Sequence, residues 1–261
     1  MNRIDRKFRD LKKNKQKAFI AYITAGYPDI SITEKLIKEL GRIGVDILEL
    51  GVPFSDPMAD GPVIQDASQA ALDKGVNLEK ILNLVKKSRP SCAIPICLMT
   101  YYNPVFCYGE ARFCQKAASS GVDGVIIPDL PPEEAVNFRK LAARSDLDTI
   151  FLLSPTSSPA RIKMVSSVSQ GFIYYVSLTG VTGARKNLPV DISQQVKAIK
   201  KYTAKPVCVG FGVSEASQVK EINRFSDGVI VGSAIVKKIK ENINQPNLIK
   251  EVSSFVAALK G

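Results

Sequence analysis

The sequence of 261 residues contains no histidine. Histidine is the side chain that most often transfers protons in enzymes, and it is also a common metal ligand. Any proton transfer by this protein must therefore use Asp, Glu, Lys, Tyr or Cys. The five cysteines, at positions 92, 97, 107, 114 and 208, include no Cys-x-x-Cys pair, so we expect no structural metal.

The sequence also lacks the features of a secreted or membrane protein. An odd number of cysteines argues against a disulfide framework, and Cys97 and Cys208 stand in apolar runs where a free thiol acts as a small hydrophobe. Residues 1–17 are charged throughout, and no later apolar run is long enough to cross a bilayer. We therefore expect a cytoplasmic protein that does not bind membranes.

Acidic residues are fewer than basic ones: 25 Asp and Glu stand against 36 Lys and Arg, which gives a net charge of +11. Such a balance is compatible with nucleic acid, acidic membranes or anionic metabolites as partners. The basic residues are spread over stretches such as 35–42, 139–144 and 237–240, and no basic stripe is interleaved with aromatics. We expect a solvated basic surface and no nucleic-acid partner.

What the sequence does contain is a regular alternation of short apolar runs with amphipathic stretches. Strands are predicted at 18–24, 46–51, 94–101, 123–128, 149–153, 171–177, 206–210 and 228–231. Helices are predicted at 32–43, 63–73, 132–144, 160–168, 192–202, 215–225 and 234–243, with extra helices at 3–12, 77–87 and 247–259.

This alternation predicts the α/β class with parallel strands, and eight units favour a single (β/α)8 TIM barrel that spans residues 1–261 as one domain. A doubly wound open sheet is the alternative. Against it, no G-x-G-x-x-G follows the first strand and no break in composition marks a second domain.

Glycine-rich loops follow the last three predicted strands. In a barrel, phosphate is often held by the loops after strands seven and eight, which here contain Gly210-Phe211-Gly212 and Gly232-Ser233. Their backbone N–H groups can approach an anion closely. Gly180 to Gly183 follow strand six. One such loop alone could be an ordinary tight turn, but together they predict a site for a phosphorylated small molecule.

Two carboxylates are candidates for acid/base catalysis. Glu49 lies in the apolar run 45–52, where desolvation disfavours its charged form, whereas Asp60 stands beside Gly61 in a turn and can stay ionised. Strand periodicity places Ile47, Glu49 and Gly51 on one face. Glu49 could instead form a structural ion pair with a lysine, and Asp60 could be an ordinary turn residue.

Aromatic and soft side chains near the strand ends could form an apolar slot for a flat ring, although such residues are more often simply core. The members of this set are Tyr22, Met99, Tyr101, Ile126, Tyr174 and Phe211.

The stretch from Leu48 to Gln65, LELGVPFSDPMADGPVIQ, resembles the signature of the tryptophan synthase alpha chain family. Supporting phrases are AYITAGYP at 21–28, MTYYNP at 99–104, GVIIPDLP at 124–131, GVTGAR at 180–185 and GFGVS at 210–214. The resemblance covers essentially the whole chain. It implies a lyase of tryptophan biosynthesis that cleaves indole-3-glycerol phosphate to indole and glyceraldehyde 3-phosphate, without metal or organic cofactor.

The resemblance also implies roles for individual residues. Glu49 would be the general acid/base at indole C3 and at the side-chain hydroxyl, and Asp60 would accept the indole N1–H. Tyr174 would line the substrate site, and Thr182 would meet Asp60 when its loop closes. The phosphate would be held by Gly183, Gly212, Gly232 and Ser233.

Asp56 and Pro57 would contact a beta chain, a pyridoxal-phosphate enzyme that takes the indole through a tunnel, in an alpha2beta2 heterotetramer. This chain itself would bind no pyridoxal phosphate. Two positions of the expected slot depart from the family pattern, because Tyr22 stands where phenylalanine is expected and Met99 where leucine is expected.

Two rival functions share some of these features. The rim glycines alone would suit another phosphate-binding barrel, such as a sugar-phosphate isomerase or an indole-glycerol-phosphate synthase. A basic barrel without activity could serve as an allosteric partner or a nucleic-acid scaffold. The presence of Glu49 and Asp60 in one phrase favours the lyase over both.

Overall fold

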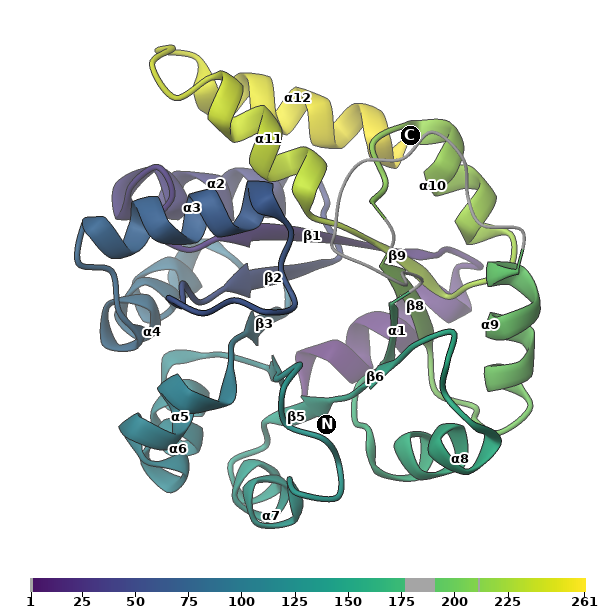
Figure 1. Ribbon diagram of the computed structural model, residues 1–261. Helices are drawn as coiled ribbons and strands as arrows, with labels where there is room; N and C mark the ends of the chain where they lie inside the picture. The colour runs from purple at the N-terminus through teal and green to yellow at the C-terminus, as the bar shows by residue number, and fades with distance from the viewer. Residues whose placement is uncertain (1, 177–190, 211) are drawn as a thin grey trace.

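The computed structural model describes residues 2–176, 191–210 and 212–261. In this part of the chain, parallel strands form one nine-stranded sheet in the order β5-β4-β3-β2-β1-β9-β8-β7-β6 (Figure 1). The strands are β1 (Ala18–Thr24), β2 (Ile47–Gly51), β3 (Ile96–Met99), β4 (Gly124–Ile126), β5 (Asp148–Ile150), β6 (Leu152–Leu153), β7 (Ile173–Val176), β8 (Val207–Gly210) and β9 (Gly228–Val231).

The sheet closes into a barrel between β5 and β6, which only Phe151 separates in the sequence. β5 pairs with β4 and β6 pairs with β7, so these two short strands together occupy the place of the single strand predicted at 149–153. The predicted (β/α)8 barrel is therefore confirmed, with its fifth strand divided in two.

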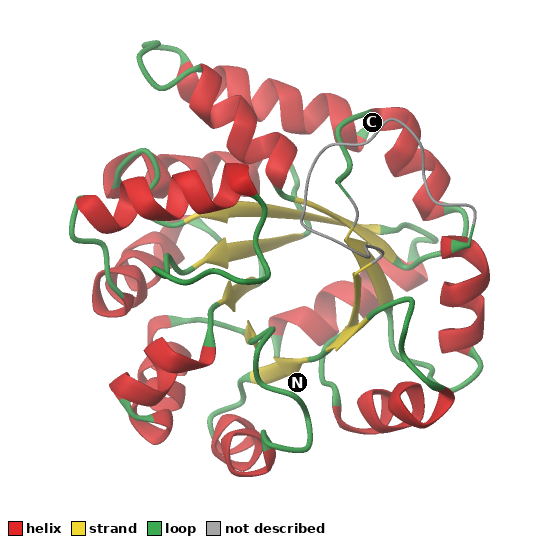
Figure 2. Ribbon diagram, viewed as in Figure 1, coloured by secondary structure: helices red, strands yellow, loops and turns green. Residues whose placement is uncertain are grey.

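Helices surround the sheet (Figure 2). They are α1 (Arg3–Lys13), α2 (Ile30–Arg42), α3 (Pro62–Asp73), α4 (Leu78–Ser88), the 3-10 helix η1 (Arg89–Ser91), α5 (Tyr102–Tyr108), α6 (Glu110–Ser120), α7 (Val136–Arg144), α8 (Pro159–Val168), α9 (Ile192–Lys200), α10 (Ala216–Asn223), α11 (Ser233–Glu241) and α12 (Leu248–Lys260). Among the described residues, no helix has the length and apolar character needed to span a membrane.

The sequence pattern did not predict α5 and α6. The buried residues of α6 are Phe113, Cys114, Ala117 and Ser120, and three of these four are small or weakly apolar. α5 buries only Val105. α5 therefore gave little periodic signal, whereas α6 buries residues at helical spacing and was missed although that signal was present.

The strands separate two apolar layers. One cluster packs between the sheet and its helices, and the other fills the barrel. The strand residues inside the barrel are Ala18, Ile20, Ile47, Cys97, Ile126, Ile150, Cys208 and Ile230. Phe172, just before β7, joins them, and Ile4, Phe8 and Leu11 of α1 pack against this layer. Since successive strand residues point to opposite faces, Glu49 shares the interior face with Ile47.

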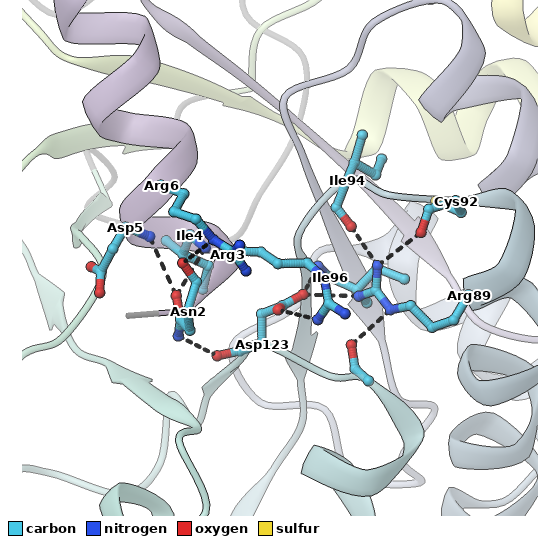
Figure 3. A network of polar contacts seen from close by, with 11 residues as sticks. Asn2, Arg3, Ile4, Asp5, Arg6, Arg89, Cys92, Ile94, Ile96 and Asp123 are labelled. Carbon is cyan, nitrogen blue, oxygen red and sulfur yellow. Dashed lines mark hydrogen bonds and ion pairs between the residues drawn. The ribbon is translucent and has the colours of Figure 1, made fainter.

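Aspartates secure the N-terminal end of the barrel. Asp123, which precedes β4, accepts hydrogen bonds at 2.8 Å from Arg3, at 2.8 Å from Arg89 and at 2.9 Å from the backbone N–H of Ile96 (Figure 3). The Asn2 side chain donates to the Asp123 carbonyl at 3.0 Å. This network fastens the start of α1 to the sheet.

Two further aspartates repeat the arrangement of Asp123. The backbone N–H of Phe19 donates to Asp46 at 2.9 Å, and that of Val207 donates to Asp227 at 3.0 Å. Each of these carboxylates also faces a lysine. The aspartates that directly precede β2, β4 and β9 therefore stabilise this end of the barrel.

Candidate active site

Glu49 projects from β2 into the barrel. Its strand neighbours in register are Tyr22 on β1 and Cys97 on β3. The side chain is completely buried, and within the described residues neither carboxyl oxygen has a hydrogen-bond partner. Burial raises the pKa of Glu49 to about 8, with a further contribution from the negative charge of Asp60. Glu49 thus holds a proton at neutral pH, as an acid requires.

No lysine or arginine in the described part of the chain forms an ion pair with Glu49. The alternative of a structural ion pair therefore has no support there. A buried carboxyl group without a partner costs folding free energy, and such groups are concentrated where chemistry needs them.

Asp60 lies in the loop between β2 and α3. Its N–H donates to the Pro57 carbonyl at 3.0 Å, and the Gln65 side chain donates to its carbonyl at 2.8 Å. The side chain is 7% exposed, so it is more buried than the polar turn expected from the sequence. Burial raises the pKa of Asp60 to about 6, because it outweighs the opposing hydrogen bond from Tyr101. Asp60 is thus mainly ionised at pH 7.

Tyr101, just after β3, ties this loop to the barrel. Its hydroxyl donates to Asp60 Oδ2 at 3.0 Å and accepts from the N–H of Ala59 at 2.9 Å. Its ring stacks on Phe54 with 5.2 Å between the ring centres. Tyr101 therefore holds the Asp60 carboxylate in place rather than opening directly onto the cavity.

A cavity of about 150 Å³ joins the two carboxylates at the C-terminal end of the barrel. Eight of the residues predicted for the site line it, namely Tyr22, Glu49, Asp60, Met99, Tyr174, Gly212, Gly232 and Ser233. Tyr101 and Ile126 do not line it, and Ile126 is packed in the barrel interior. Thr182, Gly183 and Phe211 lie outside the described residues.

Gly210, which belongs to the predicted phosphate loop, also lines the cavity. The sequence did not single out the remaining lining residues, which are Ala59, Ile64, Pro128, Leu152, Val176 and Ile230. Leu152, Val176 and Ile230 come from apolar strands, where they were indistinguishable from core. Strand parity was the available signal for Val176 and Ile230, which share the interior face with Tyr174 and Gly232. Leu152 had no predicted site residue on its own strand.

Ser233 opens α11, and Gly232 precedes it as the N-cap. The N–H groups of Ile235 and Val236 bond back to the Gly232 carbonyl, so those of the first two helical residues have no partner within the helix. Because Gly232 and Ser233 line the cavity, this helix N-terminus can accept an anion there. The described residues contain no cluster of Cys, Asp and Glu suited to a metal ion.

Comparison with known proteins agrees with this geometry. The sequence profile of the family described as "Tryptophan synthase alpha chain" matches residues 8–260. The chain belongs to the tryptophan synthase alpha chain family. The alpha chains of Geotalea uraniireducens (strain Rf4) and Geobacter sulfurreducens are 52% and 51% identical to it over 260 residues, covering 100% of this chain and 97% and 98% of theirs.

Solved structures of the family share the fold. Tryptophan synthase subunit alpha of Legionella pneumophila str. Paris superposes with a TM-score of 0.93 at 37% identity and covers 100% of this chain and 97% of its own. A chain of Mycobacterium tuberculosis tryptophan synthase gives a TM-score of 0.90 at 36% identity, with 100% and 99% covered. The resemblance expected from the 48–65 phrase is thereby confirmed.

Proposed function

We propose that this chain performs the alpha reaction of tryptophan synthase, the cleavage of indole-3-glycerol phosphate to indole and glyceraldehyde 3-phosphate, with Glu49 and Asp60 as its acid/base pair. The reaction is that of the family to which the chain belongs. The supporting observation is the difference between two carboxyl groups on one cavity, with a pKa of about 8 for Glu49 and about 6 for Asp60. At pH 7 the Glu49 carboxyl group is mainly protonated and the Asp60 carboxylate is mainly ionised.

The chemistry needs both states. Glu49 gives its proton to indole C3, and the ring becomes cationic while the Asp60 carboxylate holds the N1–H. The Glu49 carboxylate then takes the proton of the glycerol hydroxyl next to the ring. As the carbonyl forms, the electrons of the carbon–carbon bond return to the indole, and Glu49 has recovered its proton.

The substrate is held by the rest of the cavity. The phosphate group binds the backbone N–H groups of Gly212, Gly232 and Ser233, with Gly183 completing the site. The other predicted residues, Tyr22, Met99, Tyr101, Ile126, Tyr174 and Phe211, flank the indole or support those that do. Thr182 meets Asp60 when the 180–187 loop closes. The chain from 1 to 261 forms one domain around this site.

The partner is a beta chain, a pyridoxal-phosphate enzyme, and the assembly is an alpha2beta2 heterotetramer. Asp56 and Pro57 make part of the contact. In support, Asp56 is exposed, and Met58 and Phe106, which follow the neighbouring strands β2 and β3, are apolar side chains with exposures of 79% and 64%. Large exposed apolar side chains are typical of protein interfaces. Five free thiols and a biosynthetic role favour the cytoplasm.

The test is an assay of indole release from indole-3-glycerol phosphate by the purified chain, alone and with a beta chain. The wild type releases indole slowly alone and faster with its partner. Glu49→Gln keeps the shape but cannot transfer a proton, so kcat falls by about 10²- to 10⁴-fold while substrate binding is largely retained. Asp148→Asn, which alters a buried carboxyl group at the other end of the barrel, is the matched control and keeps full activity. An inert wild-type pair, or a Glu49→Gln variant with normal turnover, would refute the proposal.

A further inference from the structure

A second cavity lies at the N-terminal end of the barrel, away from the active site. Its volume is about 290 Å³, against about 150 Å³ for the cavity that holds Glu49 and Asp60. Pro206, which precedes β8, lines this second cavity, whereas Gly210, the last residue of β8, lines the catalytic one. The two cavities are therefore separated by the length of a strand, and a ligand of one does not reach the other.

Part of the second cavity is apolar. Phe8 and Leu11 of α1 line it and are 8% and 6% exposed, and Pro206 lines it from the start of β8. The Phe8 ring contacts Phe172 with 5.7 Å between the ring centres, so this wall is anchored to the barrel interior. An apolar cavity of about 150 Å³ can enclose a benzene ring. The second cavity therefore has room for an aromatic ring that carries a substituent.

The polar part of the lining is mainly cationic. Lys12, Lys15 and Lys17 line the cavity, and Asp227 is the acidic residue there. The Asp227 carboxylate already faces Lys17 at 3.6 Å and Lys200 at 2.9 Å. Within the described residues, the side chains of Lys12 and Lys15 have no hydrogen bond or ion pair. Two positive charges at this cavity are therefore left without an anion.

Lys15 has an unusual backbone conformation for a lysine. α1 ends at Lys13 with Asn14 as its C-cap, and Lys15 follows with a φ of 55°. Glycine is the usual residue at such a left-handed position after a helix, because a Cβ atom is disfavoured there. Lysines in the last turn of a helix complement its dipole, which accounts for Lys12 and Lys13 but not for Lys15. The sequence thus keeps a cation beside the cavity at an unfavourable backbone position.

We propose that this cavity is a second binding site, for a small aromatic anion whose ring packs against Phe8, Leu11 and Pro206 and whose charge is held by Lys12 and Lys15. The site is independent of the proposed function. A ligand bound there contacts α1 and the segment before β8 together. The net charge of +11 attracts any anion to this protein, so a test must remove the same charge elsewhere as a control.

The direct test is calorimetric titration of the full chain with 2-naphthoate. We expect a Kd of about 1 mM or tighter, and 2-naphthamide, which has the ring without the charge, binds at least about tenfold more weakly. Lys12→Ala with Lys15→Asn raises the Kd about tenfold, and asparagine suits the left-handed position. Lys13→Ala with Lys35→Ala removes two exposed lysines that do not line the cavity, and this matched control leaves the Kd unchanged.

A second measurement locates the ligand in the wild-type protein and needs no activity. Lysine acetylation by acetic anhydride is followed by mass spectrometry, with and without 2-naphthoate at twice its Kd. We expect acetylation of Lys12 and Lys15 to slow about threefold, while Lys13 and Lys35 keep their rates. Equal weakening by the two lysine pairs would show general attraction by charge and overturn the inference. Absence of binding, or binding that neither pair changes, would also overturn it, whatever the outcome of the indole assay.

Discussion

At the N-terminal end of the barrel, Asp46, Asp123 and Asp227 each accept a backbone N–H and face a lysine or an arginine, whereas at the C-terminal end Glu49 has no hydrogen-bond partner among the described residues. Both ends bury carboxyl groups in the same barrel. At one end the surroundings supply donors and cations, and at the other they supply apolar side chains and a second carboxylate, Asp60.

This difference shows how one side-chain type serves two purposes. The paired carboxylates of Asp46, Asp123 and Asp227 link neighbouring strands and the first helix. Their negative charge is balanced by backbone N–H groups and by lysine or arginine side chains. The pKa of Glu49 is raised by burial and by the charge of Asp60, and no donor or cation among the described residues opposes this, so its proton is available for transfer. Glu49 and Asp123 are both buried, so what distinguishes them is the partners that each carboxyl group has.

The largest effect on stability is expected at the structural end. Asp123→Ala removes the acceptor of Arg3 and Arg89 and leaves the Arg89 side chain, 12% exposed, with its charge unpaired. We expect a loss of about 3 kcal/mol in the free energy of unfolding, measured with urea, while the folded fraction keeps its activity. Lys87→Ala, which removes a surface ion pair with Glu34, is the control and costs less than about 1 kcal/mol. Equal losses of unfolding free energy in Asp123→Ala and Lys87→Ala would contradict a structural role for Asp123.

The next largest effect belongs to the chemical end. Asp60→Asn keeps an oxygen for the Tyr101 hydroxyl but has no charge with which to stabilise the cationic indole ring. We expect kcat for indole release to fall by about 100-fold, with stability unchanged or slightly improved. Steady-state kinetics and urea unfolding on the same preparation measure both. Wild-type kcat in this variant would remove Asp60 from the mechanism.

The smallest effect concerns an exception at the N-terminal end. Asp148 has one oxygen without a partner among the described residues, and burial raises its pKa from 3.8 to about 7. A raised carboxyl pKa means that the folded state loses stability as the pH rises from about 4 to about 7, because the unfolded state ionises in this range while the buried carboxyl group keeps its proton.

Asp148→Asn cannot ionise and avoids that loss. We expect the variant to be more stable than wild type at pH 8, with the gain absent near pH 4. Urea unfolding at several pH values measures the difference. A gain that does not depend on pH would show that Asp148 is not ionised at a cost in the native state.

Much of this architecture could be predicted from the sequence because the relevant signals are local. The apolar run around Glu49 predicted a buried carboxyl group, and the period of two put it on one face with Ile47 and Gly51. The glycines after the last strands predicted a site for an anion. The burial of Asp60 could not be predicted in this way, since it depends on Tyr101, which is 41 residues away in the sequence.

Other features could not be predicted from the sequence, each for a different physical reason. α6 buries mostly small side chains, which a search for large apolar residues passes over although they recur at helical spacing. Leu152 lines the cavity but belongs to a strand whose break at Phe151 depends on two different neighbouring strands. The close packing of Tyr22 against Gly51 and Gly232 joins residues from β1, β2 and the loop after β9. No local sequence pattern contains all three.

The central claim is that Glu49 carries a proton at neutral pH because it is buried and has no hydrogen-bond donor or cation as a partner among the described residues. The most direct measurement is the infrared difference spectrum between wild type and Glu49→Gln as a function of pH. We predict the band of a protonated carboxyl group at pH 7, lost with a midpoint near pH 8. A spectrum that shows an ionised carboxylate at pH 7 would contradict the account.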